Sequence, residues 1–125
     1  MRLQAFDHVN VRTANLDAML AWYGDVLGMK PGKRPDFDFP GAWLYLGDQA
    51  FLHLVGVEPA PRSIEPRIEH FAFRATGMAA FLDHLTGRGV DYRLADLPGF
   101  GITQVNIHDP DGNHIHIDFQ STEKA

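Results

Sequence analysis

Four histidines stand at matched places in the two halves of this chain. His8 is followed by His53 after 45 residues, and His70 is followed by His116 after 46. Imidazole nitrogen is a good ligand for zinc, nickel, iron and copper and a poor one for magnesium or calcium. Because the sequence contains no cysteine, a metal must be held by nitrogen and oxygen alone. The matched histidines therefore predict one transition-metal site between the two halves.

The first histidine of each half lies in a duplicated segment. Residues 6–13 (Phe-Asp-His-Val-Asn-Val-Arg-Thr) return as residues 68–75 (Ile-Glu-His-Phe-Ala-Phe-Arg-Ala). Apolar and polar residues alternate in both, which predicts a strand with one apolar face and a polar face that carries the histidine. A helical pattern follows each segment. Such a duplication indicates two similar half-units.

Any one of these histidines, taken alone, is most simply a core or surface residue. Their joint occurrence at equivalent positions favours the metal site over that alternative. His53 differs from the other three because Phe51 and Val55 share its face of the predicted strand. Two further histidines, His84 and His108, are expected to be solvated.

Candidate substrate contacts come from arginine and aromatic residues. Arg12 and Arg74 are equivalent in the two repeats and share the histidine face. They are candidates for binding a carboxylate or phosphate, and the alternative is an ion pair with Asp or Glu of the protein itself. Aromatic residues offer apolar pocket walls, with ordinary core packing as the alternative. These aromatic candidates are Phe39, Trp43, Tyr45 and Phe100.

The composition is that of one folded module. The chain has 125 residues, 45% hydrophobic and 22% charged, which is enough for one well-filled core. A net charge of −5 without a basic stripe argues against nucleic acid as a partner. No apolar stretch approaches the roughly 20 residues of a membrane helix, and no signal peptide is recognisable, so no membrane contact and a cytoplasmic location are expected.

Hydrophobic spacing and turn residues predict two βαβββ half-units within a single domain. We place module one at residues 1–57, a proline-rich linker at 58–66, module two at 67–120 and a tail at 121–125. The expected helices are 16–27, ended by Gly28, and a second from residue 78 to Gly87 or Gly89. The expected later strands of the two modules are 42–46 and 50–55, then 92–94, 102–108 and 113–119.

Two motifs carry a family resemblance. The first is the run Tyr23-Gly24-Asp25-Val26-Leu27-Gly28-Met29, and the second is the turn Asp109-Pro110-Asp111-Gly112-Asn113. Through them, and through the segments around the four histidines, the sequence resembles the vicinal oxygen chelate superfamily over essentially the whole chain. That superfamily includes glyoxalase I, bleomycin and fosfomycin resistance proteins, and extradiol dioxygenases.

The resemblance implies an α+β fold in which two paired βαβββ modules form a cupped, partly open β-barrel with flanking helices. The family's metal-ligand positions fall on His8, His53, His70 and His116. Glyoxalases and dioxygenases of the family usually have glutamate at the position of His116, and glyoxalases often have another at His53. Four imidazoles leave the charge of the ion uncompensated. The carboxylate base for proton abstraction is then missing unless His53 or His116 leaves the metal to act as the base.

Two functions are expected. One is an enzyme that uses a divalent transition metal (Zn, Ni, Fe or Mn) to chelate adjacent oxygens of a small substrate, as a lyase, an isomerase or a ring-cleaving dioxygenase. His53 and His116 would be catalytic, and the substrate would contact Arg12, Arg74, Trp43 and Phe100. The alternative is a resistance-type or sequestering protein that binds a small molecule in the cup, with vestigial histidines. The resemblance also implies a homodimer.

Overall fold

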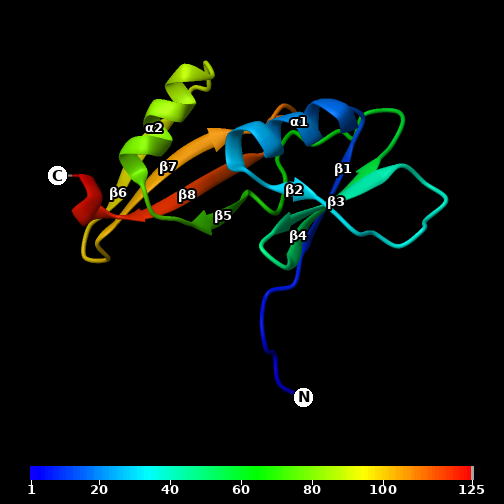
Figure 1. Cartoon of the computed structure of the whole chain (residues 1–125), viewed down its shortest axis with the longest axis horizontal. Coiled ribbons are helices and arrows are strands. Elements are labelled where there is room, and N and C mark those ends of the chain that lie inside the picture. Colours follow the sequence, from blue (N-terminus) through cyan, green and yellow to red (C-terminus); the bar gives the residue numbers. More distant parts are fainter. Residues whose placement is uncertain (125) are drawn as a thin grey trace. The chain divides into compact units, whose positions relative to one another are not determined.

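The computed structural model describes residues 1–124 of the chain. It divides into two compact units, residues 1–63 (unit 1) and 64–125 (unit 2), which are coloured blue to green and green to red in Figure 1. The boundary falls inside the linker predicted at 58–66. Each unit has the element order βαβββ, so the α+β class and the predicted duplication are confirmed.

Unit 1 has one helix and a four-stranded mixed sheet. Its elements are β1 (Val9–Thr13), α1 (Leu16–Leu27), β2 (Lys30–Pro31), β3 (Gly41–Leu46) and β4 (Gln49–Gly56). The sheet order is β1-β4-β3-β2, in which β1 is parallel to β4 and the other neighbours are antiparallel. The helix ends where the sequence predicted, because Gly28 adopts a φ of 70° and its N–H donates to the carbonyl of Gly24.

The core of unit 1 lies between α1 and one face of this sheet. Met19 and Tyr23 of the helix are fully buried, together with Leu44, Leu52 and Leu54 of β3 and β4. Residues of a strand alternate between its two faces. Because the apolar set faces the helix, the positions between them, including His53, lie on the other face.

Unit 2 repeats the arrangement with longer strands. Its elements are β5 (His70–Arg74), α2 (Met78–Gly87), β6 (Arg93–Leu97), β7 (Ile102–His108), β8 (His114–Gln120) and a 3-10 helix, η1 (Ser121–Lys124). The sheet order is β5-β8-β7-β6, again with the first pair parallel. Strand β6 extends to Leu97, beyond the 92–94 predicted, because it pairs with β7 over five positions. The terminal turn η1 was not predicted.

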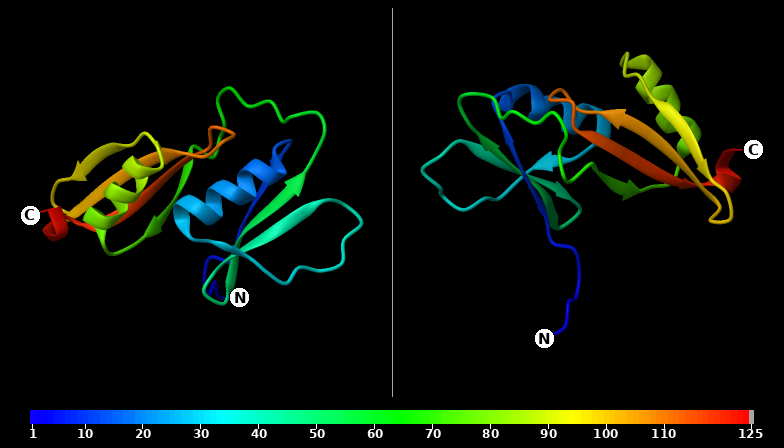
Figure 2. Two further views of the ribbon diagram at one scale, coloured as in Figure 1. Left: turned by 45° about the horizontal axis from the view of Figure 1, so that its top comes forward. Right: turned by 180° about the vertical axis from the view of Figure 1, so that it is seen from behind.

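One face of the unit 2 sheet packs on α2, which lies along a single side of the sheet in both views of Figure 2. Val105, Ile107, Ile115 and Phe119 supply this face, and Leu85 of the helix is buried against it. The histidines of β8 alternate with these residues and so occupy the opposite face. Neither helix, nor any other in residues 1–124, has the length and apolar character of a membrane span.

Candidate functional site

The two predicted ligands of unit 1 lie in contact. His8 immediately precedes β1, and His53 lies in β4 beside Asn10 of β1 and Trp43 of β3. The imidazole rings of His8 and His53 are stacked, with centroids 3.9 Å apart and planes 10° from parallel. The indole of Trp43 stacks on His53 at 3.9 Å and 8°. Two rings cannot occupy the same face of His53, so the three rings form one column.

This column lines a pocket of about 420 Å³ on the sheet face of unit 1. Tyr45 and Gln49 contribute to its wall. Trp43, predicted as a substrate contact, therefore lies in a pocket directly against a predicted ligand. His53 itself is buried, with only 7% of the residue exposed.

Electrostatics distinguish the two histidines of unit 1. The Nδ1 atom of His8 donates to Oδ2 of Asp7 at 2.6 Å, and this hydrogen bond is the main reason that the pKa of Asp7 is lowered. Gln49 holds the same residue, because its Nε2 donates to the carbonyl of Asp7 at 2.9 Å. The pKa of His53 is lowered first by burial and then by the charge of His8. His53 therefore favours its neutral form, which is the form that binds metal or accepts a proton.

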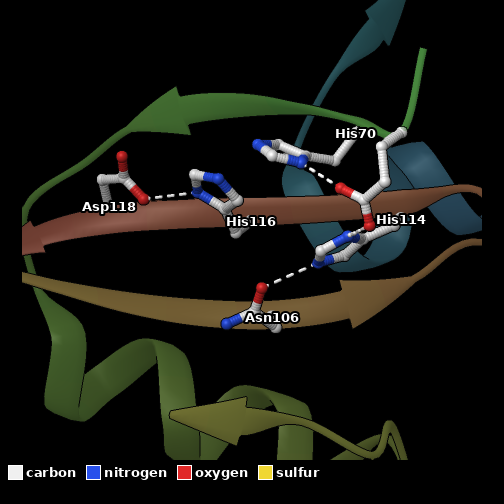
Figure 3. A network of polar contacts seen from close by, with 6 residues as sticks. His70, Asn106, His114, His116 and Asp118 are labelled. Atoms are coloured by element: carbon white, nitrogen blue, oxygen red, sulfur yellow. Dashed lines mark hydrogen bonds and ion pairs between the residues drawn. The ribbon is translucent and has the colours of Figure 1, made fainter. Parts of the chain in front are cut away.

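The two predicted ligands of unit 2 also lie close together. His70 begins β5 and His116 lies in β8, and their ring centroids are 4.5 Å apart at an angle of 45°. His116 is buried, and its Nδ1 donates to Oδ1 of Asp118 at 2.6 Å (Figure 3). A ligating histidine commonly uses one ring nitrogen for the metal and gives the other to a carboxylate. His116 has that arrangement, with Nε2 left for a ligand.

Unit 2 adds residues that the sequence analysis did not select. Glu69 forms hydrogen bonds with Nδ1 of His70 and, at 2.8 Å, with Nδ1 of His114. Both bonds lower the pKa of Glu69, and the bond from His70 has the larger effect. The Nε2 atom of His114 lies 2.7 Å from Oδ1 of Asn106. A dashed line marks this contact in Figure 3. Glu69, His70 and His114 each offer a ligand atom, and these atoms lie within 4.8 Å of one another.

A usable signal for His114 was present in the sequence. It lies two residues before His116, so strand alternation places both rings on one face. Strand register then brings further histidines beside it, since His70 and His108 both pair with His114 across neighbouring strands. His108 is exposed, as expected, and its ring lies 5.2 Å from that of His114.

The remaining predicted contacts are exposed in their own units. Arg12 of β1 pairs in register with Val55, and Arg74 of β5 pairs with Asp118. Both arginines share the histidine face of their sheet, as predicted from alternation. Phe100 lies in the turn between β6 and β7 and is 78% exposed.

Comparison with known proteins identifies the family. The model of the Glyoxalase/Bleomycin resistance protein/Dioxygenase superfamily matches residues 5–117. The chain belongs to this superfamily. Glyoxylase I 4 of Arabidopsis thaliana is 32% identical over 125 residues, an alignment that covers 94% of this chain and 71% of the relative.

Solved structures support the fold. A glyoxylase/bleomycin resistance protein/dioxygenase domain from Frankia sp. superposes with a TM-score of 0.78 at 19% identity, over 95% of this chain and 99% of that one. Lactoylglutathione lyase from Agrobacterium tumefaciens gives a TM-score of 0.73 at 21% identity, over 98% of both chains. At these identities the likeness concerns the fold alone.

Proposed function

We propose that this chain is a divalent-metal-dependent enzyme of the glyoxalase type, which acts on a small substrate with two adjacent oxygens. The proposed ligands are His8, His53, His70 and His116. One observation carries the proposal: three of these four histidines donate a hydrogen bond from Nδ1 to a carboxylate. The pairs are His8 with Asp7, His70 with Glu69, and His116 with Asp118. This leaves Nε2 of each ring for a metal, an arrangement typical of ligating histidines.

The donor set suits a transition metal of the zinc, nickel, iron or manganese group, because imidazole nitrogen binds these ions well. A divalent ion held there supplies Lewis-acid polarisation of a substrate carbonyl. The protein supplies the proton transfer. Nε2 of His116 is the proposed proton acceptor once this ring has left the metal, because Asp118 fixes its Nδ1–H and stabilises the charged ring. His53, whose pKa is lowered by burial, is the second candidate for this role.

Substrate contacts follow from the same surfaces. We propose that Trp43 stacks against an apolar or planar part of the substrate in the unit 1 pocket. Arg12 and Arg74 share the histidine faces and are proposed to bind an anionic group. Phe100, in an exposed turn, is proposed to contact the substrate body.

The metal and the turnover are tested together. Protein purified without a histidine tag is analysed for bound metal and assayed, with each metal, on panels of ketoaldehyde hemithioacetals and catechols. Stoichiometric metal with turnover supports the proposal. Inactivity with every metal on both panels would remove the enzymatic function.

Alanine at His8 or at His70 should lower metal affinity tenfold or more, about 1.4 kcal/mol, because each substitution removes one ligand. The matched control is His84→Ala, a histidine on the exposed side of α2. Isothermal titration with Zn²⁺ measures the difference. Equal affinities in all three variants would remove the proposed ligand set.

A second candidate function has its own support. Phe37 and Phe39 stack on each other at 4.8 Å and remain exposed, with the guanidinium of Arg34 about 5 Å from both rings. Trp43 lies next to them, 6.5 Å from Phe37. An exposed aromatic cluster beside a pocket suits a resistance-type protein that binds an aromatic molecule. Binding of planar aromatic compounds by metal-free protein, without turnover, would favour this alternative.

The proposal includes a homodimer, as the family resemblance implies. Sedimentation over a range of concentrations tests it, because a dimer dissociates on dilution. A monomer at every concentration would exclude the dimer and leave the metal proposal to its own tests.

A further inference from the structure

The carboxylate of Glu69 lies between two imidazoles. Its Oε2 faces Nδ1 of His70, and its Oε1 lies 2.8 Å from Nδ1 of His114. The glutamate side chain is 66% exposed, whereas that of His114 is only 18% exposed. Each histidine therefore presents the same ring atom to one carboxylate, at the edge of the sheet of unit 2.

Asn106 fixes the hydrogen on the far side of His114. Its Nδ2 donates to the carbonyl of Arg93 at 3.3 Å, which leaves Oδ1 as the atom that faces Nε2 of His114 at 2.7 Å. Since a carbonyl oxygen only accepts, Nε2 must carry the hydrogen. A neutral His114 then has its lone pair on Nδ1, directed at the carboxylate of Glu69.

Two groups that only accept hydrogen bonds repel each other unless a positive charge lies between them. That charge is either a proton on Nδ1 or a metal ion bound by both groups. The pairing of His70 with His114 across β5 and β8 brings a third nitrogen to the same place. The three ligand atoms lie within 4.8 Å of one another. Neighbouring ligands of a tetrahedral zinc ion lie roughly 3.4 Å apart, so side-chain movements on the order of 1 Å bring these atoms onto one ion.

We propose that Glu69, His70 and His114 form a divalent-metal site contained within unit 2. The proposal goes beyond the proposed function, whose ion requires His8 and His53 of unit 1. Both ligand sets include His70, so the two ions compete for that ring. The donor set of two imidazoles and one carboxylate suits Zn²⁺ and offsets part of its charge. Asn106 acts as the positioning residue, because it directs Nδ1 of His114 toward the ion.

Unit 1 provides a natural contrast. Phe51 of unit 1 is equivalent to His114 of unit 2. Phe51 lies two residues before His53, which pairs with β3, and His114 lies two residues before His116, which pairs with β7. Phenylalanine therefore fits this place in the duplicated sheet. Asp7 corresponds to Glu69 but binds only one histidine, His8, together with Gln49.

The decisive measurement observes the ring nitrogens of His114 directly. Long-range proton–nitrogen spectra of the full-length wild-type protein are recorded during titration with Zn²⁺. We expect the Nδ1 resonance of His114 to move to the position of a metal-bound nitrogen while Nε2 stays protonated. A His114 ring that keeps hydrogens on both nitrogens in excess Zn²⁺ shows that the charge is a proton, and this overturns the proposal.

Substitutions separate the two metal proposals. The variant His8→Ala/His53→Phe should still bind one Zn²⁺, and adding Glu69→Gln or His114→Phe should weaken that binding on the order of 100-fold. The matched control Asp7→Asn in the same background should change nothing. If the double variant binds no Zn²⁺ although the wild type does, the unit 2 site is wrong and the four-histidine site stands. If Zn²⁺ binds unit 2 but no substrate turns over, the enzymatic function fails and the unit 2 site stands.

Discussion

Unit 1 and unit 2 carry different chemistry on the same frame. In each, a histidine near the middle of the sheet, His53 or His116, pairs across strands with a residue of the preceding hairpin strand. That partner is Trp43 in unit 1 and Asn106 in unit 2. The two residues that flank each histidine on its face are Phe51 and Val55 in unit 1, and His114 and Asp118 in unit 2.

The difference affects how each histidine is held. His53 is buried within a column of stacked rings, and its polar contact is a backbone hydrogen bond with Ala50; burial is the main cause that lowers its pKa. His116 is held by a hydrogen bond to Asp118, which fixes Nδ1 as the bonded atom. A duplicated fold thus separates an aromatic half, suited to planar groups, from a polar half, suited to ions and protons.

The largest effect is expected at the hairpin of the polar half. Asp109 is buried in the turn between β7 and β8, where Oδ1 accepts from the N–H groups of Asp111 and Asn113, and Oδ2 accepts from the Asn113 amide. Asp109→Ala removes the acceptor of all three hydrogen bonds, which should cost about 3 kcal/mol of unfolding free energy at roughly 1 kcal/mol for each bond. Urea denaturation measures the loss.

The corresponding hairpin of unit 1 provides the control for Asp109. Its turn consists of Gly47 and the exposed Asp48, between the paired residues Leu46 and Gln49. Asp48→Ala should change the unfolding free energy by less than about 0.5 kcal/mol, as is usual for surface substitutions. Equal effects at Asp48 and Asp109 would contradict the difference between the two hairpins.

Local sequence signals were sufficient to predict most of the fold. Alternation located β5 at its observed bounds. Gly28 marked the end of α1, because the backbone there adopts the left-handed conformation that glycine favours. The extension of β6 to Leu97 was missed because it depends on pairing with β7 rather than on its own residues. The 3-10 turn at Ser121 was missed for a similar reason, since its Glu123 is placed by contacts with α2.

Each unit brings two of the predicted ligands together, and a metal site formed by all four stays a prediction. The pairing of His8 with His53 and of His70 with His116 within units followed from repeat spacing and alternation. The role of Glu69 did not, because it depends on cross-strand register, which no single segment encodes. Register brings His114 opposite His70 and so within reach of this carboxylate.

The next largest effect is expected in the aromatic half. Trp43→Leu removes the ring that stacks on His53 at 3.9 Å. The loss of buried area and stacking should cost about 2 kcal/mol of unfolding free energy. It should also raise the pKa of His53 toward its ordinary value, because burial is the main cause that lowers it. Nuclear magnetic resonance titration of metal-free protein reads this pKa, with Trp22→Leu on α1 as the matched control.

The same shift predicts how stability depends on pH. Because the pKa of His53 is lower in the folded state than in the unfolded chain, the unfolded state takes up a proton first as the pH falls. The metal-free protein therefore loses stability through His53 as the pH drops below 6.5, the ordinary pKa of a histidine side chain. Trp43→Leu should weaken this dependence. An unchanged pH profile would show that stacking on Trp43 is not what buries His53.

The smallest effect concerns how each unit begins its helix. In unit 2, Oε1 of Glu123 accepts from the backbone N–H groups of Gly77 and Met78, at 2.7 and 3.0 Å, so the terminal turn caps α2. In unit 1, Asn15 precedes α1 without a side-chain capping bond. Glu123→Ala should therefore destabilise the protein by about 1 kcal/mol, the usual value of an N-terminal cap.

Thermal unfolding and hydrogen exchange measure this effect and locate it. Faster exchange should be confined to the first turn of α2, because only the N–H groups there lose their acceptor. Glu123→Gln serves as the conservative control, since its amide oxygen can still accept both bonds without the charge that favours a helix N-terminus. It should retain more than half of the stability that Glu123→Ala loses. If Glu123→Ala and Glu123→Gln lose equal stability, the charge of Glu123 rather than its hydrogen bonds holds η1 against α2. The difference in capping between the two units is then electrostatic.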